Sequence, residues 1–201
     1  MAKPAQTYVV RSPAQLAALA SGVRQELADA LAQMGDASVA ELAATLGRPA
    51  DALYYHLRIL RQAGLVQDAG HRRRQGRREA LFRTVAPELK IDSEGVRRDD
   101  GGPLAAVVGA MLRLGARDYR RALEDAQTAL SGPGRELVAM RRTAWLDEGQ
   151  LARLNETIAA LTAPAAAAPG QGRLYAVTVL LAPVQPRRRP AGGKAPPGSR
   201  Q

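Results

Sequence analysis

The feature that most constrains the fold is the stretch of residues 38–66, which predicts two short helices joined by a tight turn. Ser38 and Glu41 have the spacing of a capping box, in which each side chain accepts a hydrogen bond from the other residue's backbone N–H. Gly47 suits the left-handed position that ends a helix, and Pro49 suits the first position of the next helix. The turn between the helices is therefore only a few residues long.

The second of these helices has two chemically different faces. At about 100° per residue, an apolar set of side chains falls on one side and a polar and aromatic set on the other. The first set is Leu53, His56, Leu57, Leu60 and Gly64, and the second is Asp51, Tyr54, Tyr55, Arg58 and Gln62. A helix pair held at a steep angle by a glycine turn, with hydrogen-bonding side chains outward, has the shape that a DNA major groove accepts.

The segments ELAATLG and LYYHLRILRQAGLV resemble the ArsR-like winged helix-turn-helix family, in the branch with a tyrosine pair before His-Leu. The resemblance covers residues 12–85 and implies a dimeric bacterial transcription regulator, whose second helix reads DNA and whose β-hairpin wing touches the DNA backbone. Many family members have serine or threonine where this chain has Pro49, so a hydroxyl-to-phosphate contact is not carried over. The thiol ligands of the arsenic and cadmium sensors are missing, which excludes metal sensing by that route.

Charge and cysteine content narrow the function classes. The chain has no cysteine, so it has no disulfide framework, thiolate metal site or cysteine nucleophile. Its net charge of +10 is uneven, because residues 1–90 carry 13 basic and 8 acidic side chains, residues 91–182 carry 11 of each, and residues 183–201 carry 5 basic and no acidic ones. This distribution predicts a polyanion-binding N-terminal domain and a neutral, associating middle segment.

The sequence shows neither a signal-peptide pattern near its start nor a run of the roughly 20 apolar residues that span a bilayer. We therefore expect a cytoplasmic protein without a membrane partner.

The N-terminal domain is predicted to comprise residues 1–90. Residues 8–10 form a short strand or arm, and helices begin after the capping residues Ser12 and Ser21. Two strands, residues 65–68 and 79–85, flank the arginine-rich sequence GHRRRQGRR and form the wing.

A polar, charged segment begins at Pro87, and its residues 91–103 are interpreted as a linker. The following helix, residues 104–130, carries a seam of residues that recur at alternating spacings of four and three positions. Small residues in this seam allow close approach of another helix. We interpret this seam as a homodimer interface comprising Val108, Leu112, Gly115, Tyr119, Ala122 and Ala126.

The rest of the segment 104–182 suggests a small β-α-β unit. Its strands are residues 137–145, which are equally compatible with a helix, and residues 174–181. Asp147 and Gln150 resemble a cap at the start of the helix that lies between the two strands. Met140, Trp145 and Tyr175 line an effector pocket in one interpretation and form plain core in the preferred one. The tail, residues 183–201, is predicted to be disordered.

The candidate DNA contacts come from the second helix, its preceding turn and the wing. Arginine binds guanine bidentately, and tyrosine donates to phosphate or stacks on thymine methyl groups. The candidates are Arg48, Ala52, Tyr54, Tyr55, Arg58, Arg72, Arg73, Arg74, Arg77 and Arg78. The alternative for the two tyrosines and Arg58 is that they form an ordinary solvent-exposed helix face. The alternative for the wing arginines is that they form a solvent-exposed run of charge. His56 is interpreted as a structural histidine, and no metal site or other cofactor is predicted.

These observations predict a mainly α fold with small β elements (α+β), formed by a winged helix-turn-helix domain, a dimerisation helix and the β-α-β unit. The expected function is sequence-specific binding of double-stranded DNA at an inverted repeat by a homodimeric regulator, and repression rests on the resemblance alone. The alternative is a nucleoid-type protein that coats DNA with little sequence preference. An enzyme that uses the C-terminal unit is not expected, because that unit has no histidine, no serine elbow and no phosphate loop.

Overall fold

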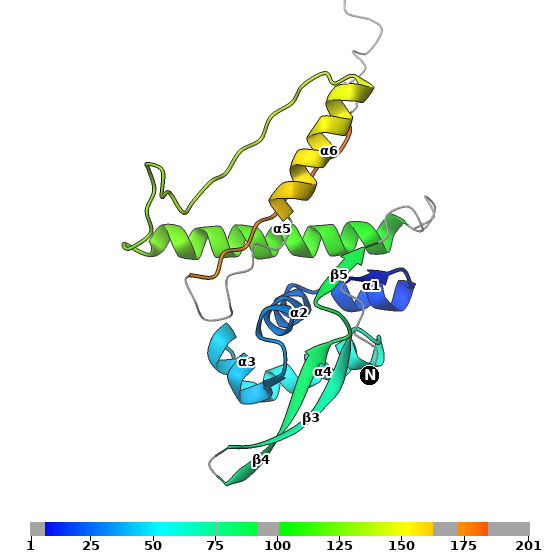
Figure 1. Cartoon of the computed structure of the whole chain (residues 1–201), viewed down its shortest axis with the longest axis vertical. Coiled ribbons are helices and arrows are strands. Elements are labelled where there is room, and N and C mark those ends of the chain that lie inside the picture. The colour runs from blue at the N-terminus through cyan, green and yellow to red at the C-terminus, as the bar shows by residue number, and fades with distance from the viewer. Residues whose placement is uncertain (1–6, 75, 92–100, 163–172, 185–201) are drawn as a thin grey trace, which may run out of the picture. The chain divides into compact units, whose positions relative to one another are not determined.

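The computed structural model describes residues 7–74, 76–91, 101–162 and 173–184 (Figure 1). The chain divides into two compact units, residues 1–138 with 165–178 and residues 139–164 with 179–201. In chain order the first unit contains β1 (Thr7–Val10), α1 (Pro13–Leu19), α2 (Gly22–Met34), β2 (Ala37–Ser38), α3 (Val39–Leu46), α4 (Ala50–Gln62), β3 (Val66–Arg74), β4 (Arg77–Thr84), β5 (Glu88–Ile91) and α5 (Gly101–Glu124). The second unit contains α6 (Glu148–Thr162).

Helices α3 and α4 are the two helices predicted from the sequence. The capping box is confirmed, because the Glu41 N–H donates to the Ser38 hydroxyl at 3.3 Å and the Ser38 N–H donates to the Glu41 carboxylate at 2.9 Å. Gly47 ends α3 with a φ of +61°, a left-handed conformation that glycine adopts without steric cost. Pro49 is the N-cap of α4, so this helix begins one residue later than predicted.

The core of the first unit is built mainly from leucines on helices α1 to α4. Buried members are Leu16, Leu19, Leu27, Leu31, Leu42, Leu53, Leu57, Leu60 and Leu65. Helix α5 packs against α1 and α2, and its Val107 joins the same cluster. The Gln25 amide reinforces this packing by donating to the Val107 carbonyl at 3.1 Å.

Two small sheets complete the first unit. Strand β4 lies between β2 and β3, with antiparallel pairing on both sides. Strand β1 pairs in parallel with β5, so that Tyr8 lies opposite Leu89. In β5, apolar Leu89 and Ile91 alternate with charged residues. The predicted linker of residues 91–103 is therefore wrong at both ends, because Ile91 belongs to β5 and residues 101–103 belong to α5. The predicted linker residues 92–100 lie outside the described part.

The β3–β4 hairpin, which is the predicted wing, extends away from the helices (Figure 1). Its strands are longer than the predicted 65–68 and 79–85, because the arginine-rich sequence continues the ladder on both sides of the turn. The register shifts between Asp68 and His71, where Gly70 has a φ of +87°. The arginines therefore stand on paired strands, which fixes the side of the hairpin to which each belongs.

The predicted β-α-β unit is corrected by the structure. Its helix is confirmed as α6, with Asp147 and Gln150 exchanging side-chain to backbone hydrogen bonds of 2.8 and 3.0 Å. Residues 137–145 and 174–181 form neither strand nor helix, because the described residues provide neither segment with a strand partner. Residues 185–201, which make up most of the predicted tail, lie outside the described part.

Candidate nucleic-acid interface

Helix α4 separates its two predicted faces as the sequence indicates. Leu53, Leu57 and Leu60 are buried beneath it. On the opposite face, Tyr54 is 56% exposed and Tyr55 is 54% exposed. These tyrosines are available to an external partner and are not part of the core.

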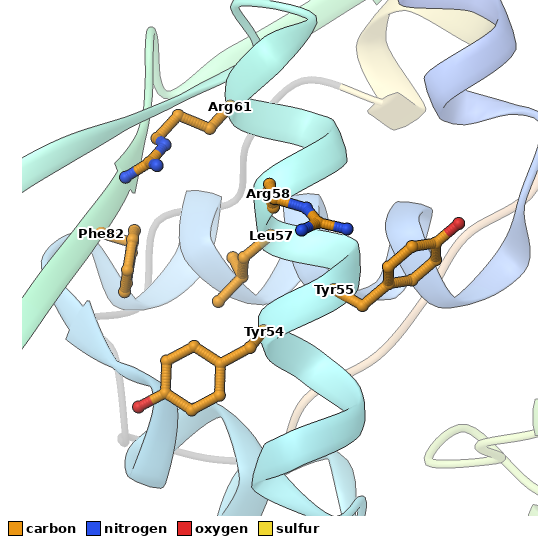
Figure 2. Close-up of a pocket in the computed structure, with 6 residues that line it drawn as sticks. All are labelled: Tyr54, Tyr55, Leu57, Arg58, Arg61 and Phe82. Carbon is orange, nitrogen blue, oxygen red and sulfur yellow. The ribbon is translucent and has the colours of Figure 1, made fainter.

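The two tyrosines project to different sides of α4 (Figure 2). Tyr55 lies beside Arg58, whose guanidinium carbon is 5.5 Å from the centre of the tyrosine ring. This cation–π contact restricts the conformations of an exposed arginine before it meets a partner. Ala52, the fourth predicted contact of this helix, is also exposed.

An open hollow of about 370 Å³ adjoins the same face of α4. It is lined by Tyr54, Tyr55, Leu57, Arg58, Arg61 and Phe82 (Figure 2). Phe82 comes from β4, and the sequence analysis missed it because its neighbourhood depends on how the hairpin folds back. The available signal was a large apolar side chain, next to Leu81, in a strand that is otherwise mostly polar.

Arg61 is the second residue of this surface that the sequence analysis missed. Its guanidinium binds both carboxylate oxygens of Asp68 on β3, at 3.0 and 3.2 Å. Both side chains are well exposed, so the pair contributes little to stability. Its geometric effect is to connect the last turn of α4 to the base of the hairpin.

The hairpin brings together the predicted arginines 72, 73, 74, 77 and 78. Arg73 lies opposite Arg78, and Arg74 lies opposite Arg77. Like charges directly opposite each other on paired strands are destabilising. A polyanion bound along the hairpin relieves that repulsion, so the register favours phosphate contact over a merely solvated charge run.

Glu41 of α3 divides the hairpin into two electrostatically different faces. Its carboxylate lies 2.6 Å from the Arg72 guanidinium and 3.6 Å from that of Arg74. The backbone N–H of Ser38, together with Arg72, lowers the pKa of Glu41 despite partial burial. By strand alternation, Arg73 and Arg78 belong to the other face. The positive charge of that face is not paired with the Glu41 carboxylate.

Arg48, which is predicted to contact DNA, is paired with a carboxylate of the protein itself. Its guanidinium binds the Glu26 carboxylate at 2.7 Å, and Glu26 also binds Arg117 of α5. Burial raises the pKa of Glu26, but the two arginines outweigh burial and hold the pKa below its ordinary value. Sequence reasoning assigned Arg48 to DNA because it stands in the turn, whereas its partner lies on α2.

His56 lies at the edge of the core, as predicted. Burial, followed by the nearby charges of Arg24 and Arg48, lowers its pKa, which favours the neutral imidazole. Its ring meets that of Tyr55 edge-on, with centroids 5.3 Å apart. In the part of the chain that the structure describes, no group of three or more His, Asp or Glu residues is arranged to hold a metal ion.

The predicted dimerisation seam lies largely beside the face of α5 that packs on the core. Leu112 and Tyr119 are exposed, and Val108, Gly115 and Ala122 are half-buried. Ala126 falls outside the seam because α5 ends at Glu124, two residues earlier. The structure thus brings five of the six predicted residues together on one helix.

Comparison with protein families agrees with this geometry. Residues 19–68 match the family model of a helix-turn-helix domain. The matched segment of the helix-turn-helix domain spans α2, α3 and α4. No match was found among curated proteins. Because a helix-turn-helix domain binds DNA, its presence supports a DNA-binding regulator.

No helix within the described ranges is long and apolar enough to cross a membrane.

Proposed function

We propose that this protein is a sequence-specific, homodimeric transcription regulator of the ArsR-like type, and that it represses by occupying an operator. The observation that carries the proposal is the exposed Tyr54–Tyr55–Arg58 surface of α4, directly opposite the buried leucines and beside the cationic hairpin. A bacterial, cytoplasmic setting belongs to the same proposal. Its action is binding and not catalysis, and no thiol-bound metal controls it, since the chain has no cysteine.

In the proposed complex, α4 enters the major groove. Arg58 reads guanine, Tyr54 and Tyr55 contact phosphate or a base methyl, and Ala52 lies close to a base. The arginines of the hairpin bind the DNA backbone or the minor groove. Two-fold symmetry places the second α4 in the next major groove, with half-sites ~34 Å apart.

A second candidate function is low-specificity DNA coating. The hairpin favours it, because five arginines on one ribbon neutralise phosphates without reading bases. In that case the surface of α4 adds little to discrimination between sequences.

Competition binding separates the two functions. Duplexes selected from a random pool by the full chain are labelled and competed with random DNA at 50 and 200 mM salt. A regulator retains a preference of about a thousandfold or more for the selected duplex at both salt concentrations. A preference of only a few-fold, falling with salt, supports coating and contradicts the proposed function.

A further inference from the structure

Arg61 lies in line with two of the proposed DNA contacts of α4. It follows Tyr54 by seven positions and Arg58 by three, so at about 100° per residue the three side chains form one row along the exposed side of the helix. All three also line the hollow beside α4 (Figure 2). Arg61 therefore belongs to the same surface as Tyr54 and Arg58, at the end of α4 that is nearer to the hairpin.

The guanidinium of Arg61 is only partly used within the protein. Its Nη1 group donates to both carboxylate oxygens of Asp68, at 3.0 and 3.2 Å. Within the described part of the chain this guanidinium makes no other hydrogen bond or ion pair, so its Nε and Nη2 groups are available to an external acceptor. The side chain is 49% exposed, so such an acceptor can reach it.

The ion pair locates this guanidinium at the junction of α4 and the hairpin. Asp68 lies opposite Phe82 in the β3–β4 ladder, and Phe82 lines the hollow. The carboxylate also reduces the number of conformations open to a long, exposed side chain. This restriction lowers the entropic cost of ordering Arg61 against a ligand.

A phosphate of the DNA backbone is the ligand that suits this position. Recognition helices contact base edges through their N-terminal residues, whereas Arg61 is the penultimate residue of α4. The hairpin arginines begin at Arg72, beyond Asp68 on the same strand. A sugar–phosphate strand that runs from the groove occupied by α4 to these arginines passes the junction where Arg61 lies.

We propose that Arg61 binds a backbone phosphate at the edge of the major groove. The contact fixes the orientation of α4 on the duplex and carries no sequence information of its own. This inference rests on the DNA binding of the proposed function. It adds a residue of α4 that acts on every duplex, in contrast to Arg58, which reads a base.

The salt dependence of DNA binding by the full chain tests this contact. Each neutralised phosphate contributes about 0.9 to the slope of log affinity against log salt, so R61A should make the slope shallower by about 1. The affinity advantage of the unmodified chain over R61A should therefore shrink about 3–4-fold between 50 and 200 mM salt. The loss should be the same on the selected duplex and on random DNA, because a phosphate contact does not distinguish sequences.

Arg83 provides a matched control. It also pairs with an aspartate, Asp36 at 2.8 Å, and its side chain is 44% exposed. Because Arg83 directly follows Phe82 in β4, strand alternation places it on the face of the strand opposite to the hollow. R83A removes the same charge and should leave the slope nearly unchanged. If R61A and R83A give the same slope, the inference is overturned.

A lysine variant separates a phosphate contact from other roles of Arg61. R61K keeps the positive charge, and phosphate accepts a lysine ammonium as a point charge, so its slope should match that of the unmodified chain. The melting temperature of R61A should stay nearly unchanged, because an exposed ion pair contributes little to stability. Weakening by R61A that is confined to the selected duplex, or that lysine does not restore, contradicts a phosphate contact.

The same measurements distinguish failure of this inference from failure of the proposed function. If the chain prefers its selected duplex but R61A behaves like R83A, only the phosphate contact is wrong. If the chain shows no preference and R61A still makes the slope shallower, only sequence-specific regulation is wrong. A chain that binds neither duplex contradicts both.

Discussion

Replacing Glu26 with glutamine should destabilise the first unit by disconnecting α5 from the turn that precedes α4. The Glu26 side chain is only 10% exposed and is the shared acceptor for Arg48 and Arg117. E26Q leaves two partly buried guanidinium groups facing a neutral amide. Because both arginines retain some solvent access, we expect a loss of about 2–3 kcal/mol, below the 3–5 kcal/mol of a fully buried pair.

The loss should be measured as unfolding by urea and by heat. In a unit of this size it corresponds to a melting temperature lower by about 4–10 °C. E124Q, at the exposed end of α5, removes the same charge without a buried partner and should change stability by less than about 0.5 kcal/mol. The reasoning is refuted if E26Q unfolds like E124Q, or if the effects of E26Q and R48M simply add in a double-mutant cycle.

The pH dependence of the same variant has a defined sign. The pKa of Glu26 is lower in the folded chain than its ordinary value of 4.5. Its contribution to stability is therefore complete above about pH 5 and is lost as the pH falls through the folded pKa. The difference in unfolding free energy between the unmodified chain and E26Q should narrow below about pH 4.5. A difference that widens in acid would contradict the assignment.

Two further predictions concern the hairpin and the core. E41Q keeps a side-chain oxygen for the Ser38 N–H but removes the charge that binds Arg72 and Arg74. The affinity for random DNA should therefore rise, and the slope of log affinity against log salt should steepen by about 1–2. An unchanged slope would mean that neither arginine reaches phosphate. L60A removes a fully buried side chain beneath α4 and should cost about 2–5 kcal/mol in denaturant unfolding, and a cost below 1 kcal/mol would show that this face does not hold the helix.

Local signals in the sequence were sufficient for the helix pair. Ser38, Glu41 and Gly47 act through hydrogen bonds and backbone conformations within a few residues, so their roles are legible from spacing alone. The exposed Tyr54 and Tyr55 follow from helical periodicity in the same way.

The rest of the site depends on contacts between residues distant in sequence. Arg48 pairs with Glu26, 22 residues earlier, and Arg72 pairs with Glu41 of α3. Neither pairing has a local signal, so the sequence analysis placed Arg48 on DNA and treated all hairpin arginines as equivalent.

The predicted β-α-β unit failed for a different reason. Alternation and β-branched residues describe a surface suited to a sheet, but they do not supply the neighbouring strand. Residues 174–181 have that composition without a partner in the described chain.

The most direct test of DNA reading by α4 compares R58A and R73A on a selected duplex and on random DNA, at one salt concentration. Loss of Arg58 should weaken binding to the selected duplex by about 1–3 kcal/mol while leaving binding to random DNA nearly unchanged. Loss of Arg73, on the hairpin, should weaken both equally. If R58A also weakens both duplexes equally, α4 does not read sequence and the account is contradicted.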